Sequence, residues 1–281
     1  MKCRVAAIQM VSTFDVEANL RSAEQQLRAA AAAGAELAVL PENFAVLDSD
    51  NLLRWADEEQ RNRIFSGFVE TMARTLGLWI VAGTIPMRSR RDGTLVEGNR
   101  VRAASILFAP DGAAFARYDK LHLFDVLVGD AQGQYRESAT FEPGDQPLVV
   151  ATPMAQLGLT VCYDLRFPEL YSWLQQEGAD IITVPSAFTY RTGEAHWEVL
   201  LRARAIETQC FIIAPNQGGV HSARRTTWGH SMIIDPWGTV LGCHANGPGL
   251  VIADLDLDQL RELRTSMPLQ QHKRFSATFT P

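Results

Sequence analysis

The feature of this sequence that most constrains its fold is the alternation of short apolar segments with longer amphipathic ones. Residues 3–10, 36–40 and 78–83 are short and apolar, which is typical of buried strands. Between them, residues 15–33 and 59–76 have the composition and spacing of helices. A chain that alternates strand and helix in this way predicts an α/β fold whose helices cover the faces of the sheets.

The same order of segments returns in the second half of the chain. A hairpin is predicted over 99–119 around Asp111-Gly112, and a polar stretch without periodicity follows at 120–146. Strands are then predicted at 157–161, 181–184, 211–214, 230–235, 239–242 and 250–255, and helices at 167–177, 194–208 and 257–264. The halves share a layout but no convincing sequence repeat, and no linker separates them. We therefore expect one domain over residues 1–281.

Charge and hydropathy exclude several classes of partner. The formal net charge of -6 argues against nucleic acid or an anionic membrane surface as the main partner. No apolar run approaches the roughly 18–20 residues that span a bilayer, and the N-terminus lacks the pattern of a signal peptide. We expect a cytoplasmic protein. Its four cysteines show no CxxC pair and no metal-ligand spacing, so free thiols are expected.

One cysteine, Cys162, differs from the others in its setting. It ends the predicted strand 157–161 and stands just before a predicted helix. A helix N-terminus offers N–H groups and partial positive charge, which favour a thiolate and can stabilise an oxyanion. The alternative is a buried structural thiol, which is the commonest environment of a free cysteine. That alternative suits Cys3, Cys210 and Cys243 better.

Two charged residues also follow predicted strands. Glu42 stands after strand 36–40 and Pro41, at the sheet edge where α/β proteins place their sites, and a carboxylate there can transfer protons. Lys120 stands where strand 113–119 gives way to the polar stretch, and a buried lysine can serve as base, Schiff-base former or fixed cation. A surface carboxylate and a solvated lysine are the alternatives at these two positions.

Three segments around these residues resemble the three motifs of the nitrilase superfamily of carbon–nitrogen hydrolases. They are PENF around Glu42, YDKLHLFD around Lys120 and CYDLRFPEL around Cys162. The similarity continues through PSAF, TGEAHWEVLLRARAIETQ, GHSMIIDPWGTVL and GPGLVIADLD, and so covers nearly the whole chain. Within the superfamily, the run HWEVLLRARAIETQC followed by GHSMIIDPWGT most resembles the branch of deaminated glutathione amidases.

The resemblance implies a fold and a set of roles. The expected subunit is a four-layer αββα sandwich, with two mixed sheets and helices outside, that forms a homodimer through helices such as those containing Trp173 and Trp197. Cys162 is implied as nucleophile, Glu42 as proton-transfer base and Lys120 as the cation beside the intermediate. Glu137, in QYRESATF, matches a second glutamate that holds the lysine and orients the substrate.

The resemblance also implies a small-molecule amide as substrate and no cofactor or metal. The expected reaction converts deaminated glutathione to 2-oxoglutarate and cysteinylglycine through a cysteine thioester. An omega-amidase acting on 2-oxoglutaramate, or another carbamoyl or aliphatic amide hydrolase, is the alternative. A binding protein that keeps the fold without chemistry is a further alternative, which a missing triad residue would favour; all three residues are present. The histidines show no metal-ligand spacing, and the chain has no Gly-rich phosphate loop.

Candidate substrate contacts follow from this chemistry. The backbone N–H of Tyr163 is expected to bind the oxyanion together with Lys120. A 2-oxo acid needs a fixed cation, for which Arg166, four residues after Cys162, and Arg191 are the candidates. Capping and ion pairing at the helix start explain Asp164 and Arg166 as well as substrate contact does. Residues 215–228 depart from the branch pattern; they are a candidate wall of the pocket and leave the leaving group open.

Overall fold

The computed structural model describes residues 1–129 and 133–280. Its strands are β1 (Lys2–Gln9), β2 (Leu37–Val39), β3 (Trp79–Val81), β4 (Ile85–Met87), β5 (Arg102–Phe108), β6 (Ala114–Asp119), β7 (Asp125–Leu127), β8 (Gln134–Arg136), β9 (Leu148–Ala151), β10 (Gln156–Leu159), β11 (Ile181–Thr183), β12 (Phe211–Ala214), β13 (Ser231–Ile234), β14 (Val240–His244) and β15 (Gly249–Asp256). Its α-helices are α1 (Val16–Ala32), α2 (Leu52–Asn62), α3 (Ser66–Leu76), α4 (Pro168–Gln176), α5 (Tyr190–Thr208), α6 (Leu257–Ser266) and α7 (Leu269–His272). Two short 3₁₀ helices, η1 (Glu137–Ala139) and η2 (Cys162–Arg166), complete the list.

The first sheet comes from the first half of the chain together with β15, and the second sheet comes from the rest of the second half. In the first sheet the order is β15-β1-β2-β3-β5-β4, and β6 pairs with β5. The second sheet has the order β14-β13-β12-β11-β10-β9. The strands β1, β2 and β3 are parallel, as are β10, β11 and β12, whereas the outer pairings are antiparallel. Both sheets are therefore mixed, as the sequence predicts.

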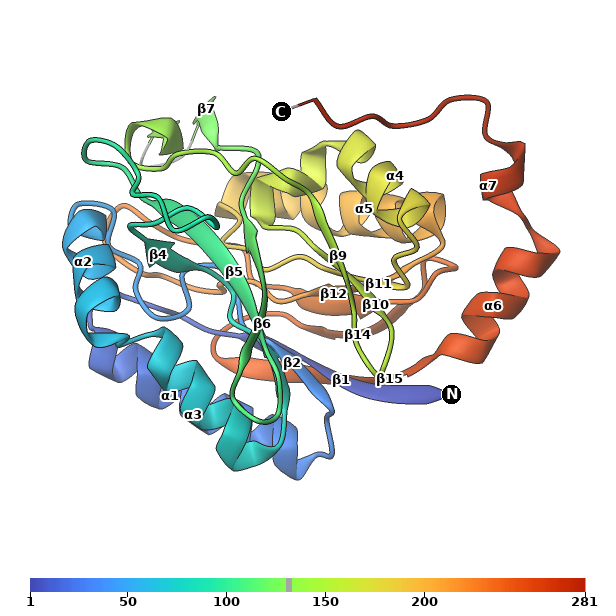
Figure 1. The fold of residues 1–281 in the computed structure, drawn as a ribbon, viewed down its shortest axis with the longest axis horizontal. Helices are drawn as coiled ribbons and strands as arrows, with labels where there is room; N and C mark the ends of the chain where they lie inside the picture. Colours follow the sequence, from blue (N-terminus) through green and yellow to red (C-terminus); the bar gives the residue numbers. More distant parts are fainter. Residues whose placement is uncertain (130–132, 281) are drawn as a thin grey trace.

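The two sheets face each other and helices cover their outer faces (Figure 1). Alternation along β1 shows how this arises, because successive side chains point to opposite faces of a strand. Val5 and Ala7 belong to the core that includes Leu157 and Leu159 of the second sheet. Their neighbours on β1 instead pack in the core that contains α1 and α3. Because α4 and α5 cover the second sheet, the four-layer αββα arrangement is confirmed.

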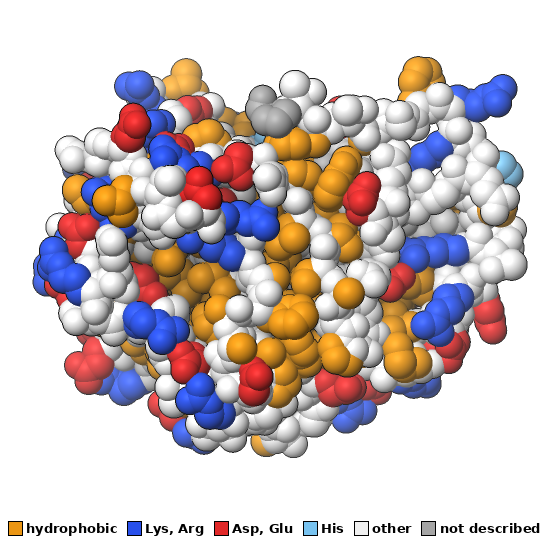
Figure 2. All heavy atoms as spheres, viewed as in Figure 1, with side chains coloured by type: hydrophobic (Ala, Val, Ile, Leu, Met, Phe, Trp, Pro, Cys, Tyr) orange, Lys and Arg blue, Asp and Glu red, His pale blue; other side chains and the backbone are white. Residues whose placement is uncertain are grey.

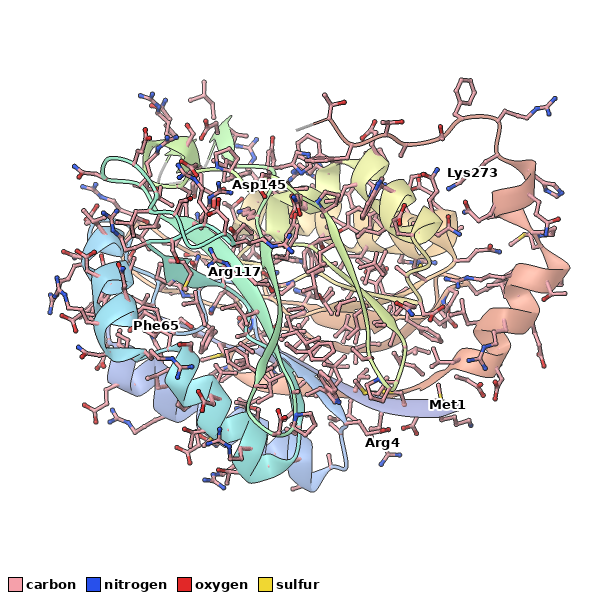
Figure 3. All side chains as sticks on the ribbon, viewed as in Figure 1. Met1, Arg4, Phe65, Arg117, Asp145 and Lys273 are labelled. Carbon is pink, nitrogen blue, oxygen red and sulfur yellow. The ribbon has the colours of Figure 1, made fainter. Side chains whose placement is uncertain are left out.

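One predicted helix is wrong in its extent. The spacing of apolar residues predicts a single helix over 59–76, but the structure has α2 and α3 with a break between them. Arg63 has a φ of 50°, which ends α2 in the left-handed conformation. The Glu59 carboxylate accepts hydrogen bonds from the backbone N–H groups of Phe65 (2.7 Å) and Ser66 (3.3 Å), and so caps the next helix. Figure 3 labels Phe65 at this break.

The polar stretch at 120–146 is more ordered than predicted. It contains the two-stranded pair β7–β8 and the short helix η1. Strands β4 and β9 were not predicted either, since they have three and four residues. Helix α5 begins at Tyr190, four residues before the predicted start at 194. The predicted hairpin is confirmed as the antiparallel pair β5–β6.

One edge of the sandwich keeps apolar side chains partly uncovered (Figure 2). Phe115 of β6 is 49% exposed and contacts Trp79 edge-on, with ring centroids 5.1 Å apart. The segment after α7 is attached to α4. Lys273 donates hydrogen bonds to Ser172 and Gln175 of that helix (Figure 3). Within residues 1–129 and 133–280, no helix has the length and apolar character needed to cross a membrane.

Candidate active site

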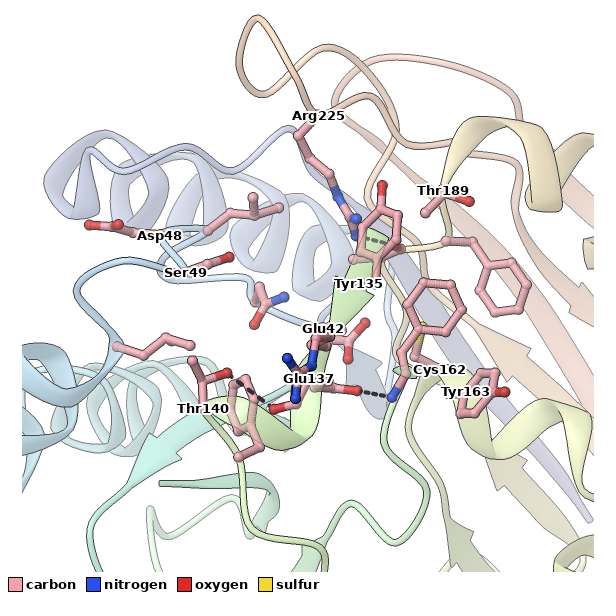
Figure 4. Close-up of a pocket in the computed structure, with 18 of the residues that line it drawn as sticks. Glu42, Asp48, Ser49, Tyr135, Glu137, Thr140, Cys162, Tyr163, Thr189 and Arg225 are labelled. Carbon is pink, nitrogen blue, oxygen red and sulfur yellow. Dashed lines mark hydrogen bonds between the residues drawn. The ribbon is translucent and has the colours of Figure 1, made fainter. Parts of the chain in front are cut away.

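The four predicted catalytic residues line one cavity of about 550 Å³ (Figure 4). Glu42 follows β2, Lys120 directly follows β6, and Cys162 follows β10. Glu137 opens η1 in the stretch after β8. These segments are far apart in the sequence, and the packing of the two sheets brings them together.

The backbone at Cys162 is unusual and sets the direction of its side chain. Its φ is 48°, in the left-handed region that non-glycine residues rarely adopt. Its N–H donates a hydrogen bond to the carbonyl of Pro185 (2.9 Å), which follows β11. This hydrogen bond stabilises the strained backbone conformation of Cys162. Strand β10 ends at Leu159, and the 3₁₀ helix η2 begins at Cys162. The predicted turn from a strand to a helix is therefore present, with a short 3₁₀ helix directly after the strand.

The buried carboxylate of Asp164 fixes this turn. It accepts hydrogen bonds from the backbone N–H of Val161 (2.8 Å) and from the hydroxyl of Tyr118 (2.7 Å). The backbone N–H and ring of His122 contact its other oxygen at 3.1 and 2.7 Å. With its acceptor positions taken up in this way, Asp164 serves the capping role that was one of its two sequence-based interpretations.

A buried cluster of opposite charges surrounds Lys120. Its Nζ lies 2.8 Å from Oε1 of Glu42 and 2.8 and 2.9 Å from the two oxygens of Glu137. Glu137 also accepts the backbone N–H of Phe124 at 2.6 Å. Burial alone would lower the pKa of Lys120, but Glu137 and Glu42 outweigh it and hold this pKa well above its usual range. Of the three roles that the sequence leaves open for Lys120, the contacts and this shift favour that of a fixed cation.

Burial dominates the electrostatics of Cys162. It raises the pKa of the thiol well above its usual range, and the Glu42 carboxylate adds to the effect. The Lys120 ammonium and the backbone amide of Ala187 act in the opposite direction. Desolvation therefore disfavours the thiolate that the sequence predicts at a helix start, and η2, with only five residues, does not offset it. Glu42 acts directly on this thiol, in the position predicted for a proton-transfer base.

The two arginines predicted to bind substrate lie elsewhere. The Arg166 guanidinium lies over the rings of Tyr163 (5.9 Å) and Phe188 (5.3 Å), and 3.3 Å from Nδ1 of His196. Arg191 is exposed and donates to the carbonyl of Gly129 at 2.8 Å. Neither is among the described residues that line the cavity. Tyr163, the predicted oxyanion contact, does line it.

Three other arginines line the cavity in which Arg166 and Arg191 were predicted to lie. Arg224 and Arg225 line the cavity together with Ser222, and all three come from the 215–228 segment that the sequence offered as a candidate wall. Arg136, next to Glu137, lines it as well. The signal that could have found them was the Arg-Arg pair in the one segment that departs from the branch pattern.

Among the residues the structure describes, no group of three or more His, Cys, Asp or Glu side chains is arranged to hold a metal ion.

Known proteins resemble this chain over most of its length. The family model described as carbon-nitrogen hydrolase matches residues 4–265. A Yersinia enterocolitica protein named deaminated glutathione amidase is 43% identical over 99% of this chain and 95% of its own length. The human protein of the same name is 42% identical over 96% of this chain and 82% of its own.

Solved structures show the same fold. Saccharomyces cerevisiae Nit3, a member of branch 10 of the nitrilase superfamily, matches with a TM-score of 0.85 and 28% identity over 98% of this chain and 97% of its own. An amidase from Nesterenkonia sp. AN1 matches with a TM-score of 0.77 and 26% identity, over 96% of this chain and 99% of its own. In that structure acrylamide has added to the active-site cysteine.

Proposed function

The chain belongs to the carbon–nitrogen hydrolase family, and we propose that it is an amidase in which Cys162 attacks a small linear amide. The observation that carries the proposal is the buried cluster in which Lys120 contacts both Glu42 and Glu137 beside the thiol. A cysteine, a base and a fixed cation at one cavity are the groups that acyl transfer requires.

The first half of the reaction forms a thioester. Glu42 takes the proton of the Cys162 thiol as Sγ attacks the carbonyl carbon of the amide. The oxyanion that forms is stabilised by Nζ of Lys120 and by the backbone N–H of Tyr163, which lies in the first turn of η2 and has no acceptor within it. The carbon–nitrogen bond then breaks, and the proton held by Glu42 passes to the departing amine.

The second half regenerates the thiol. Glu42, again a carboxylate, takes a proton from a water molecule that attacks the thioester carbon. The carbon–sulfur bond breaks, Sγ recovers the proton, and the carboxylic acid leaves. Glu137 remains ionised beside Lys120 and keeps the ammonium at the position of the oxyanion. No step needs a metal or a redox partner.

The proposed substrate is deaminated glutathione, with 2-oxoglutarate and cysteinylglycine as products. Relatives with that activity in their names, 40–44% identical, support it. Arginines at the cavity also support an anionic substrate, since they suit carboxylates. An omega-amidase acting on 2-oxoglutaramate is the second candidate, because that compound presents the same 2-oxo acid.

A substrate panel tests the proposal. It compares kcat/KM for deaminated glutathione, 2-oxoglutaramate, a carbamoyl amino acid and a nitrile in wild type and in Cys162→Ala. The expected result is hydrolysis of the first two compounds by wild type and none by the variant. Cys243→Ala is the matched control, because Cys243 is exposed on β14 and outside the cavity. Activity retained in Cys162→Ala would contradict the mechanism.

We also propose a cytoplasmic homodimer that uses α5. The sequence pointed to the helices with Trp173 and Trp197, but Trp197 is fully buried in the core of its own subunit. The exposed apolar residues near this helix are Val199 (68%), Ile206 (44%) and Trp237 (68%). A partner that covered them would remove apolar surface from water. Sedimentation at micromolar concentration should give twice the 31.1 kDa chain mass; a single species at 31.1 kDa would contradict the proposal.

A further inference from the structure

Three arginines, Arg136, Arg224 and Arg225, line the active-site cavity. Among the described residues, no carboxylate lies within ion-pair distance of Arg136, Arg224 or Arg225. Arginines elsewhere differ: Arg90 and Arg102, for example, both pair with a glutamate. Guanidinium groups that face a cavity and have no internal counter-charge form a site for an anion.

Arg225 is the best placed of the three. Its side chain is half-buried, and its guanidinium lies over the ring of Tyr135 at 5.0 Å. Its Nη2 donates to the carbonyl of Ala187 at 2.9 Å. The backbone amide of Ala187 acts electrostatically on the Cys162 thiol, so the same residue links the arginine to the nucleophile. Figure 4 shows Arg225 extending from its loop toward Tyr135 and the cavity.

The segment that carries Arg225 is anchored rather than loose. Val220 and Thr226 form an antiparallel bridge across it. At its base, the buried ring of His221 contacts the carbonyl of Ser12 through Nδ1 (2.7 Å) and the hydroxyl of Thr227 through Nε2 (2.6 Å). An arginine on an anchored segment loses less side-chain freedom on binding and can discriminate between ligands.

This segment is also connected to the base. Gln217 donates to the hydroxyl of Ser12 (2.8 Å) and to the carbonyl of Glu42 (3.0 Å). The position of Arg225 is therefore fixed relative to the two groups that carry the reaction, Glu42 and Cys162. Such a fixed distance selects ligands by the spacing between their reacting carbon and their charge.

We propose that Arg225 is the residue that binds the acyl-side carboxylate of the substrate, and that it sets the preference of the proposed amidase for this carboxylate over an uncharged acyl chain. The inference rests on the proposed amidase function. Arg224, exposed beside it, adds positive charge that draws the anion in.

Three amides with straight aliphatic acyl chains test the inference. Glutaramate has its carboxylate on the acyl side, N-butyrylglycine has one on the amine side, and butyramide has none. The measurement is kcat/KM for each in wild type, Arg225→Gln and Arg225→Lys. We expect Arg225→Gln to lose about 30-fold on glutaramate, mostly through KM, as a charge-assisted contact predicts. Losses on the other two amides should be several times smaller, and Arg225→Lys should recover part of the missing activity.

A matched control removes the same charge elsewhere. Arg28 lies on the exposed side of α1 and pairs with Glu24 outside the cavity. Arg28→Gln should leave all three values unchanged. Binding of glutaramate to Cys162→Ala, measured by calorimetry with and without Arg225→Gln, should weaken by the same factor, and this readout does not depend on turnover.

Several results would overturn the inference. Equal losses on all three amides would show that Arg225 serves the common chemistry and not the carboxylate. A loss confined to N-butyrylglycine would move the contact to the amine side. Wild type that prefers butyramide would refute the selectivity while leaving the amidase intact. If wild type hydrolyses no amide, the proposed function fails, and the calorimetric comparison still decides whether Arg225 binds the carboxylate.

Discussion

Replacing Lys120 by methionine would test whether the charge cluster works as the structure indicates. The substitution nearly preserves volume but leaves Glu42 and Glu137 facing each other without their cation. Lys120 is 2% exposed, so water cannot replace the missing partner. Removing one member of a buried ion pair costs about 3–5 kcal/mol. We expect the free energy of unfolding, measured by urea titration at pH 7, to fall by that amount.

The pH dependence makes this prediction specific. Burial already raises the pKa of Glu137, and Lys120 opposes that rise. Without Lys120 the folded-state pKa of the carboxyl should rise further above its unfolded value of about 4.3. A carboxyl with a higher pKa when folded binds its proton more tightly in the folded state. The stability of the variant should therefore fall as the pH rises from about 4.3 through the folded-state value, and the deficit should be smaller at pH 5 than at pH 8.

A surface lysine provides the control. Lys2 is 70% exposed and lies 3.9 Å from Asp256, so Lys2→Met should cost no more than about 1 kcal/mol at any pH. Because Lys120→Met also removes the ammonium that stabilises the oxyanion, kcat should fall by about 10²–10³. A stability deficit that does not change with pH, or a variant as stable as wild type, would refute the electrostatic account of this cluster.

Three further predictions follow from the same geometry. Cys162→Ala should fold with wild-type stability and lose amidase activity, and Cys162→Ser should be nearly inactive; either variant keeping more than about a tenth of kcat/KM, a difference of only about 1.4 kcal/mol, would rule out the nucleophile. Burial lowers the pKa of His221 to about 4; since the unfolded value is about 6.5, wild type should lose stability as the pH falls from 6.5 toward 4, by on the order of 2–3 kcal/mol. In His221→Gln that part of the pH profile should flatten, and an unchanged profile would mean that the loss comes from other groups. A Cβ at Gly144 would lie 2.0 Å from the carbonyl oxygen of Asp119, the residue directly before Lys120, so Gly144→Ala should lower both stability and kcat. The control is Gly67→Ala inside α3, where the nearest contact of a Cβ is at 3.6 Å. This substitution should raise the melting temperature slightly.

The sequence predicted the parts of the fold that depend on local pattern. Strand β1, helix α1 and the turn at Asp111-Gly112 were found because their signals lie within a few residues. The break between α2 and α3 was missed because the apolar spacing runs through it, while the cap at Glu59 acts across six residues. The pair β7–β8 was missed because three-residue strands carry no measurable period.

The candidate site divides in the same way. Glu42, Lys120 and Cys162 could be proposed because each follows a predicted strand and lies in a segment that resembles a nitrilase motif, although their strands belong to two different sheets. Arg225 could not, because its place depends on a contact between His221 and Ser12, which are 209 residues apart. Arg166 is close to the nucleophile in sequence, but it packs over the rings of Tyr163 and Phe188, which line the cavity, and is not itself among the described residues of the lining. Sequence proximity is a poor guide to side-chain direction after so sharp a turn.

The pairing of β1 with β15 has a consequence for how the chain is made. The register joins Lys2 to Asp256, so β1 leaves the ribosome long before its antiparallel neighbour β15 is synthesised. Until then one edge of the nascent first sheet has open hydrogen-bonding groups, which are prone to pair with other chains. Contacts this distant in sequence also slow folding. A nascent chain stalled before residue 249 should therefore be a target for chaperones, whereas one released after residue 256 can close its sheet unaided.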